Sequence, residues 1–350
     1  MVRKRPVTIL YVGPLDYGGT CLSRLWALEE LGFSVSRVDS GVPSEYSPLL
    51  RFLFRLWRKF GGGFSIFYIN RKIISALRRA QPSVVWIDKG LTVRPETISQ
   101  VKAMLPNAIT VSYSPDDMMN PNNQTPNYLG SLPLFDYHVT TKSYNVNELK
   151  QLGAREVIFV DNAYCPRIHH PTIISQIERQ KLGGPVGFIG GWEQEREQYL
   201  MFLAENDVPV RIWGPWKRNR RHHSNLRVEG RVAWGDDYAR TSSAFDINLC
   251  FLRKENRDLQ TTRSIEIPAC GGFMLAERTD EHLALFDEGK EAEFFESKEE
   301  LLCKVKYYLR HDDARQRIAL AGYRRCVQGG YSNRERLNKV MEIILKQEMI

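Results

Sequence analysis

Short apolar runs alternate with longer mixed segments along the first half of the chain. Residues 7–12 (VTILYV) have the pattern of a buried strand that ends at Gly13, and the segment after Gly19 has helical spacing up to Gly32. The same pattern predicts strands over 34–38, 84–87, 109–113, 137–140 and 157–160, with a helix over 145–152 between the last two. Because strands and helices alternate, this half predicts a parallel sheet with crossover helices.

The alternation breaks at residues 162–184 and then starts again. This stretch contains Pro166, Pro171 and the pair Gly183-Gly184, which are typical of a linker. After it, strands are predicted over 186–189, 210–213, 247–251 and 271–276, and helices over 195–206, 264–269, 298–309, 313–328 and 333–346. The sequence therefore predicts an α/β protein of two domains, 1–163 and 185–330, joined by a linker over 164–184.

The composition is that of an ordinary globular protein. Hydrophobic residues make up 43% and charged residues 26% of the 350, which excludes disorder and coiled coil as the main state. No apolar run reaches the roughly 18–20 residues of a membrane-spanning helix, and the apolar stretch after the basic start is short for a signal peptide. The six cysteines lack CxxC spacing, so we expect no zinc site, no disulfide framework and a reduced, cytoplasmic setting.

The net charge of +8 comes from one part of the chain. Between Tyr46 and Ile87 there is no Asp or Glu, whereas Lys and Arg contribute eight positive charges. The rest balances to zero, so no nucleic acid partner is expected. Within this part, residues 49–60 (LLRFLFRLWRKF) predict a helix with cations and apolar side chains on different faces. Such a helix can lie on an anionic membrane as a peripheral contact, but packing on the sheet is the favoured interpretation.

Polar residues follow two predicted strands of the first half. The turn after the first strand contains Asp16, Gly18 and Gly19 before a helix, so its backbone N–H groups could hold an anion or an acceptor. It could equally be a plain strand–helix turn. The glycines do not have GxGxxG spacing, which argues against a dinucleotide site.

A pair of acidic residues, Asp116 and Asp117, ends another predicted strand. In open parallel sheets this edge faces the ligand crevice, where a carboxylate can act as general base toward a hydroxyl. The alternative is that an aspartate caps the next helix, and either residue could take either role. Asp88 occupies the equivalent place one strand over and is a candidate on the acceptor side.

The densest group of candidate binding residues surrounds one short predicted helix: Arg257, Asp258, Thr262, Arg263, Ser264 and Glu266. The carboxylate of Glu266 could accept both hydroxyls of a ribose. The N–H groups at the start of the helix can hold a phosphate, and the two arginines can neutralise a diphosphate. Asp258 is near enough in sequence to reach the same ligand. A capped helix with surface ion pairs is the alternative, and the group as a whole favours nucleotide binding.

Residues 186–336 resemble the C-terminal half of GT-B glycosyltransferases, in particular the CgeB-like, spore-maturation branch. The resemblance rests on VGFIGGWEQER, VRIWGPW, FDINLCFLR, TTRSIEIPACGGFMLAERTDEHLALF and the late YSNRERL. It implies two Rossmann-like domains facing a cleft, with parallel sheets and helices on both faces. It also implies that the last segment, 331–350, crosses back to the first domain.

The resemblance also implies roles for individual residues. Glu266 stands where the second glutamate of a Glu-x7-Glu motif binds the ribose, and Asp258 stands in place of the first. Trp216 would stack on the nucleobase. No DxD flanked by apolar strands is present, so no metal is expected and arginines would hold the diphosphate. Three residues after the first strand of this half would lie near the phosphates: Gly190, Gly191 and Arg196.

These observations predict a glycosyltransferase that moves a sugar from a nucleoside diphosphate, with UDP as the expected carrier, to a hydroxyl of a glycan, lipid-linked or protein acceptor. No cofactor other than the nucleotide sugar is expected. An inverting reaction would use Asp116 or Asp117 as base, and a retaining one needs no side-chain base. Two alternatives remain: a nucleotide-sugar epimerase on the same fold, and a catalytically silent sugar- or anion-binding protein at a membrane surface.

Overall fold

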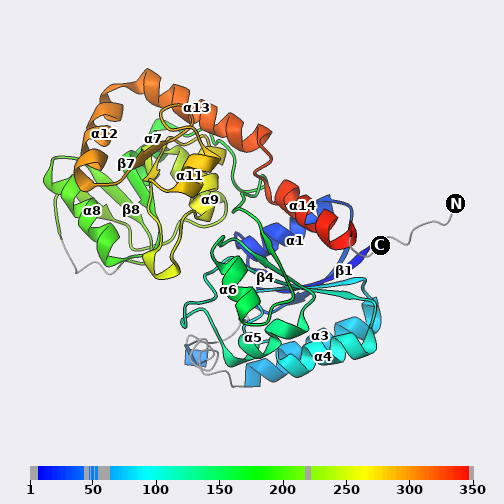
Figure 1. Ribbon diagram of the computed structural model, residues 1–350. Coiled ribbons are helices and arrows are strands. Elements are labelled where there is room, and N and C mark those ends of the chain that lie inside the picture. Colours follow the sequence, from blue (N-terminus) through cyan, green and yellow to red (C-terminus); the bar gives the residue numbers. More distant parts are fainter. Residues whose placement is uncertain are drawn as a thin grey trace. The chain divides into compact units, whose positions relative to one another are not determined.

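The computed structural model describes residues 7–42, 47, 49–50, 52–53, 64–216 and 222–346, and the side chains of 64–67 are left aside. The chain divides into two compact units (Figure 1). Unit 1 consists of Met1–Asp161 and Asn333–Ile350, and unit 2 of Asn162–Ser332. Most of residues 49–60, where the sequence predicts an amphipathic helix, lie outside the described residues.

Unit 1 is built on a six-stranded parallel sheet of order β2-β1-β3-β4-β5-β6. Its strands are β1 (Thr8–Gly13), β2 (Ser34–Asp39), β3 (Val84–Asp88), β4 (Ile109–Ser114), β5 (Tyr137–Thr140) and β6 (Glu156–Phe159). Its helices are α1 (Thr20–Glu30), α3 (Phe64–Ala80), α4 (Pro95–Met104), α5 (Pro126–Ser131), α6 (Asn145–Gln151) and α14 (Asn333–Lys346).

Both faces of the β1 strand are buried, which explains its unbroken apolar run. Successive side chains of a strand point to opposite faces. Ile9 and Tyr11 pack with α1 and α14, whereas Leu10 and Val12 pack with α3 and α4. A sheet covered by helices on both faces is the arrangement predicted from the alternation of strands and helices.

The α14 helix, drawn in red beside α1 in Figure 1, closes unit 1 from the far end of the chain. Leu337, Val340, Met341 and Ile344 are buried and recur every three to four residues, as on one face of a helix. They join the core residues of β1, β3 and β4. Arg336 adds an ion pair to Asp161, with 3.0 Å between Nη1 and Oδ2.

Unit 2 has a second six-stranded parallel sheet, of order β12-β11-β10-β7-β8-β9. Its strands are β7 (Gly184–Ile189), β8 (Val210–Trp213), β9 (Leu226–Val228), β10 (Phe245–Cys250), β11 (Met274–Glu277) and β12 (Glu293–Phe295). Its helices are α7 (Gln176–Leu182), α8 (Gln194–Glu205), α9 (Asp236–Ser243), α10 (Thr262–Ala269), α11 (Asp280–Leu285), α12 (Lys298–Arg310) and α13 (Asp312–Gln328).

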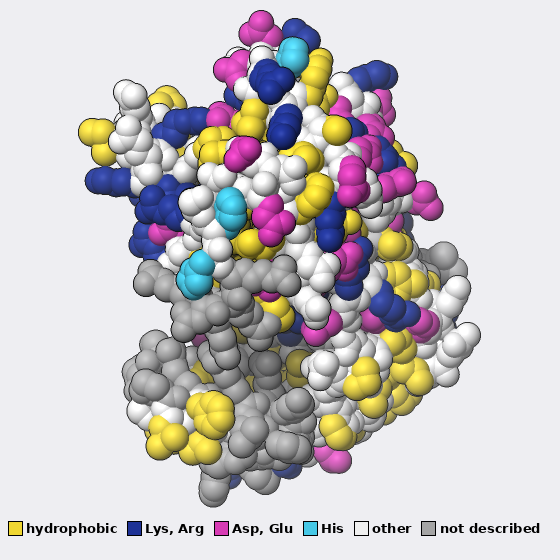
Figure 2. All heavy atoms as spheres, turned by 90° about the vertical axis from the view of Figure 1, so that its left-hand side faces the viewer, with side chains coloured by type: hydrophobic (Ala, Val, Ile, Leu, Met, Phe, Trp, Pro, Cys, Tyr) yellow, Lys and Arg dark blue, Asp and Glu magenta, His cyan; other side chains and the backbone are white. Residues whose placement is uncertain are grey.

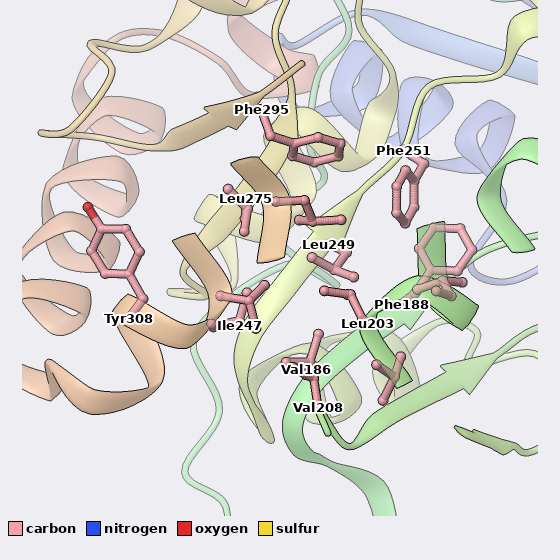
Figure 3. Close-up of a cluster of buried hydrophobic side chains, with 14 of the residues drawn as sticks. Val186, Phe188, Leu203, Val208, Ile247, Leu249, Phe251, Leu275, Phe295 and Tyr308 are labelled. Carbon is pink, nitrogen blue, oxygen red and sulfur yellow. The ribbon is translucent and has the colours of Figure 1, made fainter. Parts of the chain in front are cut away.

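The core of unit 2 lies between its sheet and the helices α8 and α12 (Figure 3). Val186 and Phe188 of β7 meet Leu249 of β10 and Leu203 of α8 there. Close packing also explains Gly187, because a Cβ on that residue would stand 2.2 Å from the ring of Phe245. The residues of β7 and β10 therefore pack closely against each other at the centre of this sheet.

Residues 164–184, for which the sequence predicts a linker, lie within unit 2. Cys165 and Ile168 are buried, and Tyr164 forms an isolated β-bridge with Ser332. The helix α7 follows, with a capping box in which Ser175 and Glu178 satisfy each other's backbone N–H groups. Proline and glycine mark bends in this stretch, but its side chains contribute to the fold of unit 2.

Charges of both signs are mixed on the face shown in Figure 2. Networks such as Arg278 with Glu288 and Glu300, and Lys304 with Glu288 and Glu293, show the same balance inside unit 2.

None of the helices within the described part of the chain has both the length and the apolar character needed to cross a membrane.

Candidate functional site

Each sheet reverses its strand order at one inner pair of strands. In unit 1 the pair is β1 and β3, and in unit 2 it is β7 and β10. In open parallel sheets the connections leave such a pair in opposite directions, so that a crevice opens at the carboxyl ends of its strands. The residues after these strand ends are therefore the places where a ligand site is expected in each unit.

The glycine pair after β7 begins the site of unit 2. Gly190 donates its N–H to the carbonyl of Trp213 at 2.8 Å, and a Cβ on it would stand 2.5 Å from Cζ of Phe188. Apart from its two chain neighbours, no described residue has an atom within 4 Å of the position of a Cβ on Gly191. Gly190 is thus required by packing, whereas the open side of Gly191 can admit a ligand.

Trp216 is not placed to stack on a nucleobase, which corrects the role expected from the resemblance. Its side chain is only 6% exposed and packs edge-on against Phe188 in the core. The indole Nε1 donates to the carbonyl of Gly190 at 2.9 Å. Trp216 therefore supports the glycine turn from behind. The neighbouring Trp213 is also buried and donates to Leu182, as expected for a core residue.

Arg196 reaches the same turn from the first part of α8. Its Nη1 donates to the carbonyl of Gly191 at 3.1 Å, and its Nη2 lies 3.4 Å from Glu193 Oε1. Its Nε is buried and has no hydrogen-bond partner among the residues that the structure describes. Burial lowers the pKa of Arg196, and the positive charge of Arg263 adds to the effect, while Glu193 opposes it. A partly unsatisfied cation at this position would gain from a bound anion.

Arg263 and Glu266 lie one turn apart on α10, the helix after β10. The Nε of Arg263 donates to the carbonyl of Ile189, which ties α10 to the end of β7. The Glu266 side chain is buried, with 8% of the residue exposed. Within the described chain, no group donates a hydrogen bond to its carboxylate, and its ion-pair contact is His169 Nε2 at 3.7 Å. A buried carboxylate in that state has its acceptor capacity available.

Two residues beside Glu266 were not predicted from the sequence. His169 accepts the N–H of Cys165 on Nδ1 at 3.1 Å, so a neutral ring carries its proton on Nε2, toward Glu266. Burial lowers the pKa of His169, although Glu266 opposes this. Tyr238 of α9 packs edge-on against His169 with 5.3 Å between ring centroids, and no described residue forms a hydrogen bond with its buried hydroxyl. Burial, followed by Glu266, raises the pKa of Tyr238.

The start of α10 is closed by side chains. Thr261 and Ser264 form a capping box, in which each side-chain oxygen accepts a backbone N–H near the start of the helix. Ser264 is fully buried and its Oγ lies 2.7 Å from His282 Nε2. Ser264 therefore orders the helix and is not open to a phosphate, which corrects its predicted role. Thr262 is partly exposed at the first position of the helix.

The loop before α10 contains the other two candidates. Asp258 accepts a hydrogen bond from Asn256 Nδ2 at 2.7 Å and donates its own N–H to the carbonyl of Arg253. Arg257 is exposed and has a left-handed backbone, with φ of 46°. Asp258 thus shapes the loop through Asn256, and the described contacts do not join it to Glu266.

The site of unit 1 is a cavity of about 340 Å³ at the carboxyl ends of β1, β2, β3 and β4. Its lining is rich in hydroxyl, amide and charged groups: Asp16, Ser40, Lys89, Thr92, Ser114, Asp116, Asn122 and Asn123. Lys89 Nζ and Asp116 Oδ2 stand 3.7 Å apart across it. Groups of this kind suit a ligand with several hydroxyls.

The two adjacent aspartates have different environments, which separates roles that the sequence left open. Asp116 is partly exposed, with 37% of its side chain accessible, and lines the cavity. Asp117 is 1% exposed, and its Oδ1 accepts hydrogen bonds from Asn145 Nδ2 at 2.9 Å and from the N–H of Met119 at 3.0 Å. Asp116 is therefore the accessible base candidate, and Asp117 holds the loop behind it.

Asp88 does not face an acceptor, which corrects the prediction made from its place at a strand end. It is 1% exposed and forms a bidentate pair with Arg24, with Nε–Oδ2 at 2.6 Å and Nη2–Oδ1 at 3.0 Å. The hydroxyl of Tyr11 donates to the same carboxylate at 2.5 Å. Asp88, at the end of β3, therefore connects β1 and α1 through hydrogen bonds inside unit 1.

The glycine-rich turn after β1 is held by its own backbone. Gly18 has φ of 80°, and Gly19 donates its N–H to the carbonyl of Asp16 at 2.9 Å. Gly19 then begins α1 without a side-chain cap. Asp39 accepts the N–H groups of Leu15 and Gly41 at 3.1 and 2.7 Å, so the turn is fixed to the end of β2. Only Asp16 of the turn's three candidates lines the cavity.

Among the residues that the structure describes, no three His, Cys, Asp or Glu side chains are grouped as a metal ion would require. The residues missed from the sequence are Glu193, His169 and Tyr238. The signals available for them were weak, because a His in a Pro-rich stretch and a Tyr in an amphipathic helix are common. Only the folding of unit 2 brings His169 and Tyr238 beside Glu266.

Residues 195–342 match the family described as glycosyl transferase-like. Similar solved structures include sucrose-phosphate synthase from Thermosynechococcus elongatus, with 11% identity, a TM-score of 0.66 and coverage of 97% of this chain and 100% of that one. Anabaena HepE in complex with UDP has 11% identity, a TM-score of 0.60 and coverage of 97% and 100%.

A putative UDP-N-acetylglucosamine 2-epimerase from Listeria monocytogenes is also similar, with 10% identity, a TM-score of 0.59 and coverage of 99% of this chain and 97% of that one. No curated protein matches the chain in sequence. At these identities the solved structures establish the fold. They confirm the predicted fold class of two Rossmann-like α/β domains of the GT-B type.

Proposed function

We propose that this protein is a GT-B glycosyltransferase that transfers a sugar from a nucleoside diphosphate to a hydroxyl acceptor. The observation that carries the proposal is the buried Glu266 carboxylate, which has no hydrogen-bond donor among the described residues and lies on the same helix as Arg263. The family match over residues 195–342 includes both. The motifs of residues 186–336 further support the CgeB-like branch.

Each donor-side residue has a role that follows from its surroundings. Glu266 would accept the two ribose hydroxyls, with His169 and Tyr238 limiting its movement. Arg263 and Arg196 would stabilise the diphosphate, whose charge grows as the sugar leaves. The unsatisfied Nε of Arg196 would gain a partner there. The similar fold of Anabaena HepE, solved in complex with UDP, supports uracil as the base.

On the acceptor side, we assign the cavity of unit 1, with Asp116 as its accessible carboxylate. If the reaction inverts the anomeric carbon, Asp116 would take the proton of the attacking hydroxyl. Lys89, with its Nζ 3.7 Å from Asp116 Oδ2, would help to position that carboxylate. If the reaction retains configuration, Asp116 would orient the acceptor hydroxyl without removing its proton.

The test is calorimetric titration with UDP, GDP, ADP, dTDP and CMP. We expect one nucleotide to bind, and Glu266→Gln to weaken it about tenfold, because one hydrogen bond to a charged group is worth about 1.5–3 kcal/mol. Glu299→Gln, an exposed change on α12, is the matched control and should leave the affinity unchanged. If none of the nucleotides binds, or if both variants bind as tightly as the wild type, the donor-site assignment is wrong.

The similarity to an epimerase makes a second activity worth separating. A UDP-sugar 2-epimerase acts on the donor alone, whereas a transferase needs an acceptor for rapid turnover. Incubation with the UDP-sugar alone, followed by analysis of the sugar's configuration, distinguishes the two. An epimerised sugar without acceptor would replace the transferase proposal, and an unchanged sugar would support it. Nucleotide binding without either activity would favour the silent binding protein.

A further inference from the structure

A groove of about 710 Å³ lies between α3 and α4 of unit 1, outside the cavity assigned to the acceptor. Four arginines line it: Arg71, Arg78, Arg79 and Arg94. The single acidic residue in its described lining is Glu96. Four guanidinium groups around one space repel one another unless an anion lies between them.

The positions of these arginines follow from the helix period. Arg71 and Arg78 are seven residues apart, so they lie two turns apart on one face of α3, with Ile74 and Ser75 between them. Arg79 follows directly, and Arg94 precedes α4. The side chains of Arg71, Arg78 and Arg79 are exposed. The groove therefore presents a row of cations with an apolar strip of Ile74 beneath it.

Three of these arginines, Arg71, Arg78 and Arg79, differ from most buried or paired arginines of the described chain in their contacts. No ion pair or hydrogen bond joins the side chains of Arg71, Arg78 or Arg79 to any described residue. By contrast, Arg278 contacts three glutamates and Arg24 is paired with Asp88. The sequence explains the difference, since residues 46–87 contain no Asp or Glu at all. The groove thus contains three of the eight cations of this acid-free segment, together with Arg94.

The groove is held in shape by one buried amide. Asn70, at 9% exposure, accepts the N–H of Arg94 at 3.1 Å and the hydroxyl of Thr97 at 2.6 Å on Oδ1. Its Nδ2 donates to the carbonyl of Thr92 at 3.2 Å. These three bonds fix the start of α4 against α3. A ligand would meet cations whose backbones are already in place, which reduces the ordering cost of binding.

We propose that this groove binds a ligand with several phosphate-type groups. Guanidinium groups form paired hydrogen bonds with phosphate oxygens, and a row of them fits a ligand with two or more such groups. The ligand could be soluble or could be the headgroups of anionic lipids, since both present the same chemistry. This binding does not depend on the proposed transferase activity, because none of the groove residues is part of the donor or acceptor site.

The first experiment is titration of the full chain with tripolyphosphate, at low salt and again at 150 mM salt. We expect binding that weakens as salt increases, and about tenfold weaker binding by the double variant Arg71→Glu/Arg78→Glu. The control is Arg334→Glu/Lys339→Glu, which changes the charge of unit 1 by the same amount at exposed positions of α14. Circular dichroism and thermal melting verify that both variants are folded.

Because a polyphosphate could also enter the donor site, Arg263→Gln is titrated in parallel. We expect it to keep the binding event that Arg71→Glu/Arg78→Glu loses. If the loss occurs instead in Arg263→Gln, the tripolyphosphate binds the donor site and the groove proposal is overturned. If both charge-reversal pairs weaken binding equally, the effect is one of net charge and the proposal is likewise overturned.

A second arm identifies the source of the anion. Sedimentation with phosphatidylcholine vesicles, with and without phosphatidylglycerol, is compared for the wild type and the two double variants. Binding to the anionic vesicles that only the groove variant loses supports the proposal with lipid headgroups as the ligand. Binding of tripolyphosphate without vesicle binding supports it with a soluble ligand. If the wild type binds neither probe, the groove has no anion site.

Discussion

Two buried carboxylates, one in each unit, differ in how completely they are hydrogen-bonded. Asp88 receives both Nε and Nη2 of Arg24, at 2.6 and 3.0 Å, and the hydroxyl of Tyr11 at 2.5 Å. Glu266 receives no hydrogen bond from the described residues, and His169 Nε2 lies 3.7 Å from its Oε1. Both lie beside strands that end at a reversal of strand order. From the sequence both were candidate site residues, with Glu266 the stronger because it belongs to the densest group of candidate binding residues.

The difference shows which buried charge belongs to the architecture and which is available to a ligand. Burying a charge is costly unless it is paired and hydrogen-bonded, and Asp88 meets this condition within the protein. Glu266 does not, and its neighbour Tyr238 has a buried hydroxyl that also lacks a partner. Polar groups left unsatisfied in one place are a better sign of a binding site than an acidic residue at a strand end.

The largest expected effect is on stability, from Asp88→Ala compared with Glu266→Ala. Removal of Asp88 leaves Arg24 buried without its partner, and breaking such a pair costs about 3–5 kcal/mol of the free energy of unfolding. Removal of Glu266 leaves no closely paired charge behind, so it should lower the free energy of unfolding by about 1 kcal/mol or less. Urea denaturation followed by circular dichroism measures both.

The double variant Arg24→Met/Asp88→Leu is the control for this comparison. Replacing a whole buried ion pair by apolar side chains is often close to neutral, so the double variant should recover most of the stability that Asp88→Ala loses. If Glu266→Ala destabilises the protein as much as Asp88→Ala, Glu266 is a structural residue and the contrast between the two carboxylates fails.

The next effect concerns the adjacent aspartates. In an inverting reaction, Asp116→Ala should lower kcat about a hundredfold or more, because general-base catalysis contributes about 10²–10⁴. Its stability should change little, since its ion pair with Lys89 is partly exposed. Asp117→Ala should instead cost about 1–3 kcal/mol of unfolding free energy, through the lost bonds to Asn145 and Met119.

Steady-state transfer assays and urea denaturation on both variants test this pair. The reverse pattern, with Asp117→Ala inactive at full stability, would move the base to Asp117. Equal losses of activity at normal stability in both would show that the two carboxylates act together.

The fold could be predicted from the sequence because its signals are local. The buried strands of both sheets appear as short apolar runs, and α12, α13 and α14 begin within one residue of the predicted positions. The strands β9 and β12 were missed because each has three residues, too few for a pattern. The helix α7 was missed because prolines and glycines flank it.

The site could be predicted only in part, because partners come from distant segments. Asp88 and Arg24 are 64 residues apart in the sequence, and nothing local shows that they pair. Trp216 follows a strand, as a nucleobase contact would, but its indole donates to Gly190, 26 residues away. Residue type and strand position indicate where polar groups gather. Burial and hydrogen bonding decide which of them remain available.

A third prediction compares buried histidines in the two units. His138 in unit 1 has its pKa lowered by burial to about 4, and so does His282 in unit 2, from an ordinary value of 6.5. Between pH 6.5 and 4 the unfolded chain therefore binds more protons than the folded chain. Stability should be constant above pH 6.5 and fall as the pH is lowered, by about 2 kcal/mol per histidine at pH 5.

The contacts of His282 give this prediction a local consequence. Its Nδ1 donates to the carbonyl of Glu277 at 2.6 Å, so the neutral ring accepts the hydroxyl proton of Ser264 on Nε2. Protonation of Nε2 removes that acceptor at the start of α10. Urea denaturation between pH 7 and 5 measures how steeply the unfolding free energy falls with pH. We expect a smaller fall in His282→Gln and the fall of the wild type in the exposed control His222→Gln. An unchanged pH dependence in His282→Gln would contradict the lowered pKa of His282 in the folded chain.

The smallest expected effect tests whether Trp216 is a structural residue, as Asp88 is, or a ligand-binding residue, as proposed for Glu266. Trp216→Phe removes the bond from Nε1 to the carbonyl of Gly190 but keeps an aromatic ring against Phe188. We expect a loss of about 1 kcal/mol in unfolding free energy, the usual contribution of one hydrogen bond, and nucleotide affinity within about twofold of the wild type. Trp234→Phe, at a residue more than half exposed, controls for removal of an indole and should leave stability unchanged. An affinity loss of tenfold or more at normal stability would instead show that the indole of Trp216 contacts the nucleotide. In that case, complete hydrogen bonding within the protein would no longer distinguish structural residues from binding residues in unit 2.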